Sequence, residues 1–516
     1  MNTLTRISIL LLFMAGLSGC ASIDFDYPRT ESTALTETAE TTLGQKNAPA
    51  VAAHPSNESG FHPLPDGIDA LAARIYLAER AEKSIDLQYY LIKNDLVGRA
   101  FLHALMRAAD RGVRVRLLLD DVFTSGYDVG MMALSHHPNF EVRIFNPWNR
   151  GLAGRALGSV ADFGRINRRM HNKSFTVDNQ VTIIGGRNIA DEYFGAREDV
   201  NFGDLDVMAI GPVVREVSAM FDEYWNHETA LPPPAFTPPL EDPDAALSAL
   251  RTSLTAAYED VPYSQYREAV QERFSKYATA GNDIFEWARY RLVYDSPDKG
   301  LKKQDGEIQR ISLQLLDELS RAENEMIIIS PYFVPRKAGI EKLLAVEERG
   351  VAVKIITNSL AANNQFSVHG GYAPSRKPLL EGGVEIYEAR PDSDIAGAEL
   401  VAASGATATL HTKAFVVDRR DVFVGSFNFD PRSANLNTEM GVMIYDHDLA
   451  ARLADRIYEK IPTDTYEVYL DDDGDLRWRG YDDTGTPFVE TKEPETSWWD
   501  RFVAGFVRIL PIRSQL

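Results

Sequence analysis

The sequence predicts an α/β protein built from two similar αβ-sandwich halves, related by a pseudo-twofold axis, with an active site at their interface. Three observations lead to this prediction. Helical and strand patterns alternate along the chain, the same order of elements occurs twice, and each copy ends in the same set of polar residues. Strands that alternate with helices indicate crossover connections on a mostly parallel sheet. The length of 516 residues exceeds one ordinary core and suggests roughly three domains.

The composition limits the classes of function. A hydrophobic share of 44% and a charged share of 25% are ordinary for a folded protein with a large core. The net charge of -21 provides no overall positive field for gripping nucleic acid, so we expect no nucleic-acid partner. A locally basic cleft on an acidic body still leaves a nuclease open. Cys20 is the only cysteine, which excludes an internal disulfide and a cysteine-cluster metal site.

The first twenty residues have the pattern of an export signal. Arg6 precedes an apolar run over residues 7–17, which is too short to span a bilayer and fits a secretory signal peptide. The tetrapeptide that ends in Cys20 resembles a bacterial lipobox, in which the cysteine becomes lipidated. An ordinary signal peptide or a short membrane anchor is the alternative, and all of these place the mature protein outside the cytoplasm. By resemblance to lipoprotein sorting, Ala21 favours the outer membrane over the inner membrane, with the folded body facing the periplasm.

The segment after the signal predicts a flexible tether. Residues 21–60 are rich in Thr, Ala, Ser and Glu and show no apolar period. Order is expected to begin near Pro65. The first half is then predicted to contain a helix over about 68–81, a strand over 85–92, a helix over about 96–111, and strands over 113–119 and 140–144.

The same order of elements returns in the second half, which indicates an internal duplication. The second copy is predicted to contain a strand over 326–333, a helix over 337–349, and strands over 351–356 and 384–387. Prolines at 232–234 and 238–239 predict a stiff linker between the copies. It is followed by a polar helical insert over 245–280, to which we assign no function. The predicted units are a signal peptide (1–20), a tether (21–60), a first half (61–230), a linker and insert (231–300), a second half (301–460) and a C-terminal segment (461–516).

The C-terminal segment predicts a β-hairpin followed by an amphipathic helix. Residues 471–475 resemble a calcium loop, but they lie between two strand patterns and lack the downstream glutamate, so we interpret them as an Asp-Gly turn. A helix over 498–510 gathers its aromatic and aliphatic residues on one face, with Ser497 and Asp500 as a cap. That face is suited either to a bilayer interface or to packing on the protein body.

Each half ends in the same constellation of polar residues, and this is the strongest functional signal. It comprises a His-x-Lys triplet, an aspartate five residues after the lysine, and a Gly-x-x-Asn tetrad, at identical offsets and 240 residues apart. The residues are His171, Lys173, Asp178 and 185–188 in the first half, and His411, Lys413, Asp418 and 425–428 in the second. Two such sets at corresponding places in a repeat are not expected by chance.

The pattern suits phosphodiester chemistry. Histidine and lysine at i and i+2 of a strand project from one face, so each half can supply one pair to a common cleft. One neutral imidazole can attack phosphorus to form a covalent intermediate, while the other passes a proton to the leaving alcohol and activates the acceptor. The lysines, with Asn188 and Asn428, can stabilise the charge on the phosphoryl oxygens, so we expect neither a metal nor a cofactor. Ser426 is a further candidate phosphate contact, and Gly186 stands in its place in the first half.

The two motif aspartates carry two interpretations. Asp178 and Asp418 are candidate catalytic residues because they belong to the repeated constellation. Both lie where a strand meets a turn, and a carboxylate commonly accepts hydrogen bonds from backbone donors there. We prefer the structural role, and direct proton transfer is the alternative.

These residues resemble the twin HxKxxxxD motifs of the phospholipase D superfamily, and the similarity extends from about Phe61 to Leu516. The resemblance implies that His171 is the nucleophile and His411 the acid and base. It also implies that Asp204 and Glu439 are the carboxylates that orient the histidines.

Within the superfamily the chain is most similar to bacterial cardiolipin synthases of the C-type branch. The stretches that carry this similarity include 85–92, 117–121, 145–147, 293–297, 331–335 and 429–433. The resemblance implies a phosphatidyltransferase that makes cardiolipin through a phosphatidyl-histidine intermediate. Phosphatidylglycerol would be the acceptor and phosphatidylethanolamine the donor, with a helper protein as a further partner and the membrane surface as the place of work. The alternatives are a phospholipase D that releases phosphatidic acid, an envelope nuclease, and a non-catalytic lipid-binding lipoprotein.

Overall fold

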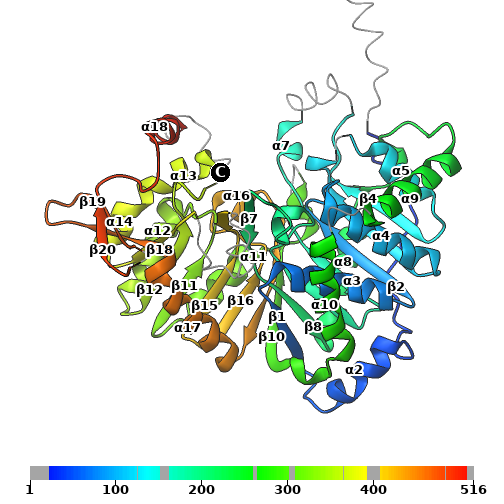
Figure 1. The fold of residues 1–516 in the computed structure, drawn as a ribbon, viewed down its shortest axis with the longest axis horizontal. Helices are drawn as coiled ribbons and strands as arrows, with labels where there is room; N and C mark the ends of the chain where they lie inside the picture. The colour runs from blue at the N-terminus through cyan, green and yellow to red at the C-terminus, as the bar shows by residue number, and fades with distance from the viewer. Residues whose placement is uncertain are drawn as a thin grey trace, which may run out of the picture.

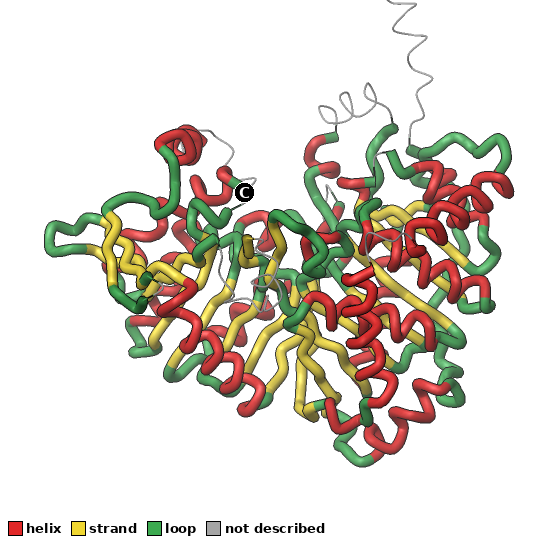
Figure 2. The backbone as a smooth tube through the Cα atoms, in the orientation of Figure 1, coloured by secondary structure: helices red, strands yellow, loops and turns green. Residues whose placement is uncertain are grey.

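One continuous sheet runs through both halves of the molecule. The computed structural model describes residues 23–124, 126–150, 162–259, 264–301, 308–363, 365–391, 407–482 and 484–507. Within them, eighteen strands form the large sheet, and helices pack around it (Figures 1 and 2). The first half occupies the right side of Figure 1 and the second half the left side.

The first half has its strands in the order β9-β4-β3-β2-β5-β6-β8-β1. The strands are β1 (Glu58–Leu64), β2 (Ser84–Tyr89), β3 (Arg114–Asp120), β4 (Phe140–Phe145), β5 (Ser174–Val177), β6 (Val181–Gly185), β8 (Asp206–Ile210) and β9 (Ala230–Leu231). The helices are α3 (Gly67–Arg80), α4 (Leu96–Asp110), α5 (Asp128–His136), α7 (Phe163–Ile166) and α8 (Pro212–Trp225). The helices and strands expected from the periodicity are present, with bounds shifted by a few residues.

The second half repeats this arrangement in the order β10-β17-β16-β15-β11-β12-β13. Its strands are β10 (Glu286–Tyr294), β11 (Glu325–Ile329), β12 (Ala352–Asn358), β13 (Glu385–Ala389), β15 (Ala414–Val417), β16 (Asp421–Gly425) and β17 (Met440–Tyr445). Its helices are α11 (Ile311–Leu319), α12 (Arg336–Glu347), α13 (Phe366–Tyr372), α14 (Arg376–Glu381), α16 (Pro431–Asn435) and α17 (His447–Asp464). The predicted duplication is therefore visible in the order of the strands.

The halves join through the antiparallel pairing of β1 with β10, at the centre of the sheet. The expectation of a mostly parallel sheet is wrong. In the part of the chain that the structure describes, only four pairings of the large sheet are parallel, two in each half. The remainder of each half consists of a short hairpin and its neighbours, such as β5 with β6, whose strands run antiparallel. Sequence analysis also missed β10 as a strand, because its pattern lies in the region taken for the linker.

Three apolar layers hold the sheet. One lies under α3 and α4 in the first half, and one lies under α11, α12 and α14 in the second half. The third draws on both halves: α8 and α17 pack on the opposite face, around residues such as Phe61, Val207 and Val416. This shared layer makes the two halves one packing unit, since neither half could bury it alone.

The predicted flexible tether is wrong for residues 23–60. This segment is packed on the first half, and it contains α2 (Thr42–Ala52), whose first turn is capped by the Thr41 hydroxyl. Buried arginines hold the segment: Arg116 donates to the carbonyl of Ser32 at 2.9 Å, and Arg143 donates to the carbonyl of Thr30 at 2.6 Å. Polar backbone contacts of this kind leave no apolar period, so composition alone suggested disorder.

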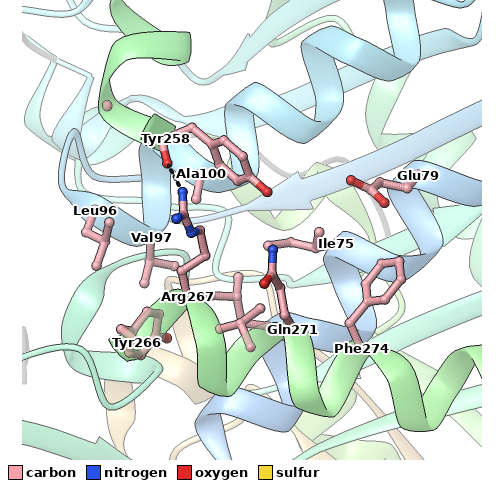
Figure 3. Close-up of a pocket in the computed structure, with 13 residues that line it drawn as sticks. Ile75, Glu79, Leu96, Val97, Ala100, Tyr258, Tyr266, Arg267, Gln271 and Phe274 are labelled. Carbon is pink, nitrogen blue, oxygen red and sulfur yellow. Dashed lines mark hydrogen bonds between the residues drawn. The ribbon is translucent and has the colours of Figure 1, made fainter. Parts of the chain in front are cut away.

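The insert forms two helices, α9 (Pro243–Glu259) and α10 (Ser264–Thr279), that pack on the first half. Tyr266 donates to the carbonyl of Phe194 at 2.8 Å, and the Phe274 ring meets the Tyr76 ring edge-on. A cavity of about 250 Å³ lies between these helices and α3 and α4 (Figure 3). None of the predicted site residues lines it.

The C-terminal segment contains the predicted hairpin, with β18 (Thr465–Leu470) paired to β19 (Leu476–Tyr481). The Asp471 carboxylate accepts from the backbone N–H groups of Asp473 and Asp475, so these aspartates build a turn. A further strand, β20 (Pro487–Glu490), extends the sheet, and α18 (Trp498–Val507) follows. Residues 508–510 of the predicted helix lie outside the described residues.

The N-terminal signal also lies outside the described residues, and with it Cys20. None of the helices in the described part of the chain combines the length and hydropathy of a transmembrane segment. Further short elements complete the fold. They are β7 (Val200–Gly203), β14 (Thr407–Leu410) and 3-10 turns at Asp121–Phe123, Asp191–Tyr193, Pro233–Ala235, Asn282–Ile284, Pro297–Gly300 and Ala373–Ser375.

Candidate active site

Two parallel strand contacts between the halves position the motif histidines. β7 of the first half pairs with β14 of the second half in parallel, and Gly203 lies opposite Leu410. At the corresponding place an isolated parallel bridge joins Met170 to Thr438. The next residue of each chain segment is therefore a histidine on one side and a carboxylate on the other.

The histidine backbones are anchored across the interface. The His171 N–H donates to the carbonyl of Thr438 at 2.8 Å, and the His411 N–H donates to the carbonyl of Gly203, also at 2.8 Å. The backbone of each histidine is thus held by a hydrogen bond to the opposite half. The strands that follow them, β5 and β15, are buried along their whole length, which holds the adjacent lysines in place.

Each imidazole is also paired with a carboxylate from the opposite half. His171 Nδ1 lies 2.8 Å from Glu439 Oε2, and His411 Nδ1 lies 2.5 Å from Asp204 Oδ2. A carboxylate at Nδ1 favours the tautomer that carries its proton there and leaves Nε2 as the basic nitrogen. The two carboxylates that the family resemblance implied are therefore the residues that contact the histidines.

The two carboxylates are held differently. Glu439 accepts hydrogen bonds from the hydroxyls of Ser426 (2.6 Å) and Ser433 (2.7 Å). Ser426 was predicted to contact phosphate, and its hydroxyl donates instead to the carboxylate behind His171. In the first half a Cβ at Gly186 would lie 2.2 Å from Asp204 Oδ1, so only glycine leaves room for the shorter carboxylate. The difference between Gly186 and Ser426 thus belongs to the histidine-orienting groups.

The lysines are buried beside the histidines. Lys173 Nζ donates to the carbonyl of His171 at 2.6 Å, and Lys413 Nζ lies 2.7 Å from His411 Nδ1 and 3.2 Å from its Nε2. Burial lowers the pKa of Lys173 to about 7 and that of Lys413 to about 8, although nearby carboxylates partly offset this effect. A bound phosphate would favour the charged form of both lysines.

Burial also lowers the pKa of both histidines. It acts together with the charge of Lys413 to lower the pKa of His411 to about 3. The pKa of His171 is lowered by burial, with Glu439 opposing the shift. Burial raises the pKa of Asp204, but the charges of Lys413 and His411 outweigh it and hold that pKa at about 2. Without substrate, neutral imidazoles therefore face an ionised carboxylate.

The two asparagines predicted to bind substrate are buried with unused acceptors. Asn188 donates from its Nδ2 to the Tyr193 hydroxyl at 2.9 Å. Within the described residues, the Oδ1 atoms of Asn188 and Asn428 have no hydrogen-bond partner. An unpaired buried acceptor is costly, and a hydroxyl of a bound substrate could donate to it, whereas contact with a phosphoryl oxygen would use the amide N–H groups.

Aromatic rings line the site, and sequence analysis did not identify them as site residues. The Tyr90 ring meets His171 edge-on at 5.0 Å between centroids, and Tyr193 meets His411 in the same way at 5.1 Å. Phe202 stacks on His411 at 5.3 Å, and Tyr332 lies 6.4 Å from it. A signal was available, since Tyr90 and Tyr332 follow equivalent strands of the repeat.

The motif aspartates lie at the far ends of the strands that carry the histidines. At about 3.3 Å per residue, Asp178 lies roughly 20 Å along the chain from His171. Its carboxylate accepts from the backbone N–H groups at positions 82–84, and that of Asp418 accepts from those at 323–325. These amides begin β2 and β11, so the observed contacts of both aspartates are structural.

A family model described as "Cardiolipin synthase, PLD-like domain" matches residues 75–225 and 315–461, once in each half. The chain belongs to this family. PLD denotes phospholipase D, so the resemblance indicated by the paired motifs is confirmed. The family assignment makes the chain a phospholipase D-type phosphodiester transferase with two PLD-like halves.

Individual relatives agree with the family assignment. Cardiolipin synthase C of Escherichia coli (strain K12) is 43% identical over 473 residues, which cover 90% of this chain and 97% of that protein. A protein of Helicobacter pylori (strain ATCC 700392 / 26695), named only as uncharacterized, is 32% identical and covers 99% of this chain and 100% of its own length. Among solved structures, phosphatidylserine synthase of Haemophilus influenzae Rd KW20 has a TM-score of 0.56 at 14% identity. It covers 90% of this chain and 96% of its own, so the two share the fold.

The backbone contacts of Asp178 predict a loss of stability without a loss of chemistry. Asp178→Ala removes a charged acceptor from three amides, and we expect it to lower the free energy of unfolding by about 3 kcal/mol. Phosphodiester turnover at low temperature should stay close to that of the parent protein. Denaturant unfolding and initial rates measure the two effects, with Asp418→Ala as the matched variant in the other half. An inactive Asp178→Ala protein of unchanged stability would instead favour direct proton transfer.

The lowered lysine pKa values predict an alkaline limit on activity. A lysine holds its charge below its pKa and loses it as the pH rises through that value. Positive charge next to the phosphoryl oxygens should therefore fall off between about pH 7 and 8 in the free enzyme. We expect kcat/KM, which reports on the free enzyme, to decline across this range. A profile that continues to rise above pH 9 would contradict the expectation.

Proposed function

We propose that the protein is a cardiolipin synthase that transfers a phosphatidyl group from one phospholipid to the hydroxyl of phosphatidylglycerol. The observation that carries the proposal is the crosswise pairing of two histidines with two carboxylates in one buried site. Family membership and the 43% identity to Escherichia coli cardiolipin synthase C support the same reaction.

In the first step, His171 Nε2 attacks the phosphorus of the donor lipid and forms a phosphatidyl-histidine. The bond from phosphorus to the headgroup oxygen breaks, and His411 gives a proton to that leaving alcohol. His411 needs to be protonated for this step. The negative charge of the bound phosphate favours that form, and Asp204 at Nδ1 stabilises the imidazolium.

In the second step, His411 accepts the proton from the hydroxyl of phosphatidylglycerol. The oxygen attacks phosphorus, and the bond to His171 breaks. Lys173, Lys413, Asn188 and Asn428 are proposed to hold the phosphoryl oxygens through both steps. The reaction returns both histidines to their starting protonation states, so it needs no other reactant.

Phosphatidylethanolamine is the proposed donor, and a helper protein is a proposed further partner, both by resemblance to the C-type branch. Hydrolysis to phosphatidic acid is the second candidate, since it differs only in the acceptor. The buried Tyr193 ring and the half-buried Phe202 ring beside His411 favour transfer, because they limit the entry of water.

We also propose that the protein works at a bilayer surface of the cell envelope, anchored through Cys20, with the outer membrane as the favoured location. Exposed aromatic side chains support a lipid-facing surface. Tyr127 precedes α5, and Phe163, Phe366 and Trp498 are the first residues of α7, α13 and α18; all four side chains are exposed. α5, α7, α13 and α18 lie along the upper edge of the molecule in Figure 1, so these helices form one rim.

α18 is the most apolar part of this rim. The exposed fractions are 67% for Trp498, 61% for Trp499, 49% for Phe502 and 54% for Phe506. The helix lies against α13 and is capped by the reciprocal bonds of Ser497 and Asp500 that the sequence indicated. The sequence left two alternatives for this helix, packing on the protein body or lying in a bilayer interface. Both apply in this proposal, because α18 contacts α13 while its aromatic face stays exposed.

The reaction is tested with the purified full-length protein and vesicles of phosphatidylglycerol and phosphatidylethanolamine. We expect cardiolipin as the main product and retained activity with EDTA. His171→Ala and His411→Ala should each lower the rate by at least about 1000-fold, because one group attacks and the other moves the proton. In the His411→Asn protein a phosphatidyl adduct should accumulate on His171, detected by mass spectrometry. Phosphatidic acid as the sole product would replace this proposal by a hydrolase, and an adduct on His411 of the His171→Asn protein would exchange the two roles.

Quenching by bilayer lipids tests the lipid-facing helix. The chain has six tryptophans, and two of them lie on α18. In vesicles of brominated lipid we expect these two to account for most of the fluorescence quenching, because they are highly exposed while the other four are buried or half-buried. Trp498→Phe with Trp499→Phe should abolish most of the quenching, while Trp287→Phe, whose ring stacks on His54, should leave it unchanged. Equal quenching in the double variant would show that α18 stays out of the bilayer.

A further inference from the structure

A second apolar cavity lies directly beside the candidate active site. It measures about 270 Å³ and is enclosed by the ends of β2 and β3, by α4 and α5, and by α9 of the insert. Its walls are largely aliphatic and aromatic, and they include Tyr90, Phe123, Gly130, Met131, Leu134 and Leu254. The volume lies just below the usual range of small-ligand sites, about 300–1,000 Å³.

Tyr90 connects this cavity to His171. Its ring lines the cavity and meets the His171 imidazole at 5.0 Å between centroids. Asp120, which also lines the cavity, accepts a hydrogen bond of 2.8 Å from the N–H of Met170, the residue before the histidine. A group held at His171 is therefore separated from the cavity by one aromatic ring.

The cavity also reaches the exposed aromatic residues near α5. Phe123 and Tyr127 line the cavity, and their exposed fractions are 48% and 40%. The Phe123 ring packs edge-on against Tyr90 at 5.5 Å. An apolar path therefore runs from the exposed rim at α5, past the edge-on pair of Phe123 and Tyr90, to the wall of His171.

We propose that this cavity holds an acyl chain of the phospholipid whose phosphate is bound at His171. The inference rests on the proposed function and names the group that the site recognises. The position of the cavity next to His171 indicates what binds there. A donor lipid whose phosphate is bound at His171 places its acyl chains, which are its apolar part, near Tyr90. An aliphatic wall binds them through the area removed from water.

The insert gives this cavity its outer wall. Leu254 of α9 is buried in it, and Leu250 and Ser253 of the same helix also line it. Two surface contacts join α9 to the first half, a hydrogen-bond contact of Asp244 with His136 and an ion pair of Arg251 with Asp110. The sequence assigned no function to the insert. On this proposal, α9 of the insert forms part of the acyl-chain site next to His171.

Gly130 provides a direct test because it lines the cavity from within α5. A Cβ added there meets no heavy atom within 4 Å, so a side chain can begin at this position without a clash. We would measure phosphatidyl transfer by the full-length protein from dioleoyl and dihexanoyl donor lipids. Gly130→Trp should lower kcat/KM for the long-chain donor at least about tenfold relative to the short-chain donor, since a filled pocket rejects the longer chain.

Two control variants distinguish the effect of filling this cavity from a general loss of activity or stability. Gly130→Ala adds one methyl group and should leave the ratio of the two kcat/KM values unchanged. Ala345→Trp fills the larger groove of about 600 Å³ between α11, α12 and α16, and should also leave the ratio unchanged. An unchanged ratio in Gly130→Trp, or a changed ratio in Ala345→Trp, would overturn the proposal.

Photo-crosslinking tests the same site without depending on turnover. A phospholipid with a diazirine near the end of one acyl chain should label peptides that contain Met131, Leu134 or Leu254, and Gly130→Trp should reduce that labelling. Labelling confined to α11 and α12 would overturn the inference. A protein that binds and labels in this way but transfers no phosphatidyl group would contradict the proposed function and leave the acyl-chain site in place.

Discussion

The candidate active site depends on two parallel strand contacts, through which each half places a carboxylate against the histidine of the other half. Gly203 and Leu410 lie opposite each other in one contact, and Met170 and Thr438 in the other. Because the strands are parallel, the next residue on each side faces the next residue on the other, and the imidazoles meet Asp204 and Glu439. A single half would have a histidine without its carboxylate and a carboxylate without its histidine. The catalytic constellation is thus a property of the join, and the continuous sheet through β1 and β10 keeps that join in register.

The same join creates the electrostatic conditions of the site. Two lysines, two histidines and two carboxylates are buried together, where unpaired charge is expensive. The cost is limited by pairing and by lowered pKa values of the four basic groups. A bound phosphate adds negative charge and favours the protonated forms. The proposed mechanism therefore couples binding of the substrate phosphate to protonation of the histidine that donates the proton.

Segments outside the duplication break the symmetry of the two halves. The N-terminal segment covers buried arginines of the first half, the insert closes a cavity beside His171, and α18 presents aromatic residues at the rim. None of these has a counterpart in the other half at the same place in the described part of the chain. We propose that the frame shared by the two halves carries the phosphodiester reaction, and that the additions, two on the first half and one on the second, favour an apolar substrate.

The sequence by itself determined the duplication, most helices and strands, and the identity of the repeated histidines, lysines and asparagines, because these follow from periodicity and fixed local spacing. Asp204 and Glu439 could be named only through the family resemblance, since their histidines lie 207 and 268 residues away in the chain. The role of Ser426, the packed N-terminal segment, the β1–β10 junction and the Tyr90 wall were decided by tertiary structure. Each depends on contacts between distant segments, many of them polar or backbone bonds that leave no apolar period in the sequence. Local sequence patterns indicate the secondary structure that a segment favours, whereas its contacts with distant segments are determined by the tertiary structure.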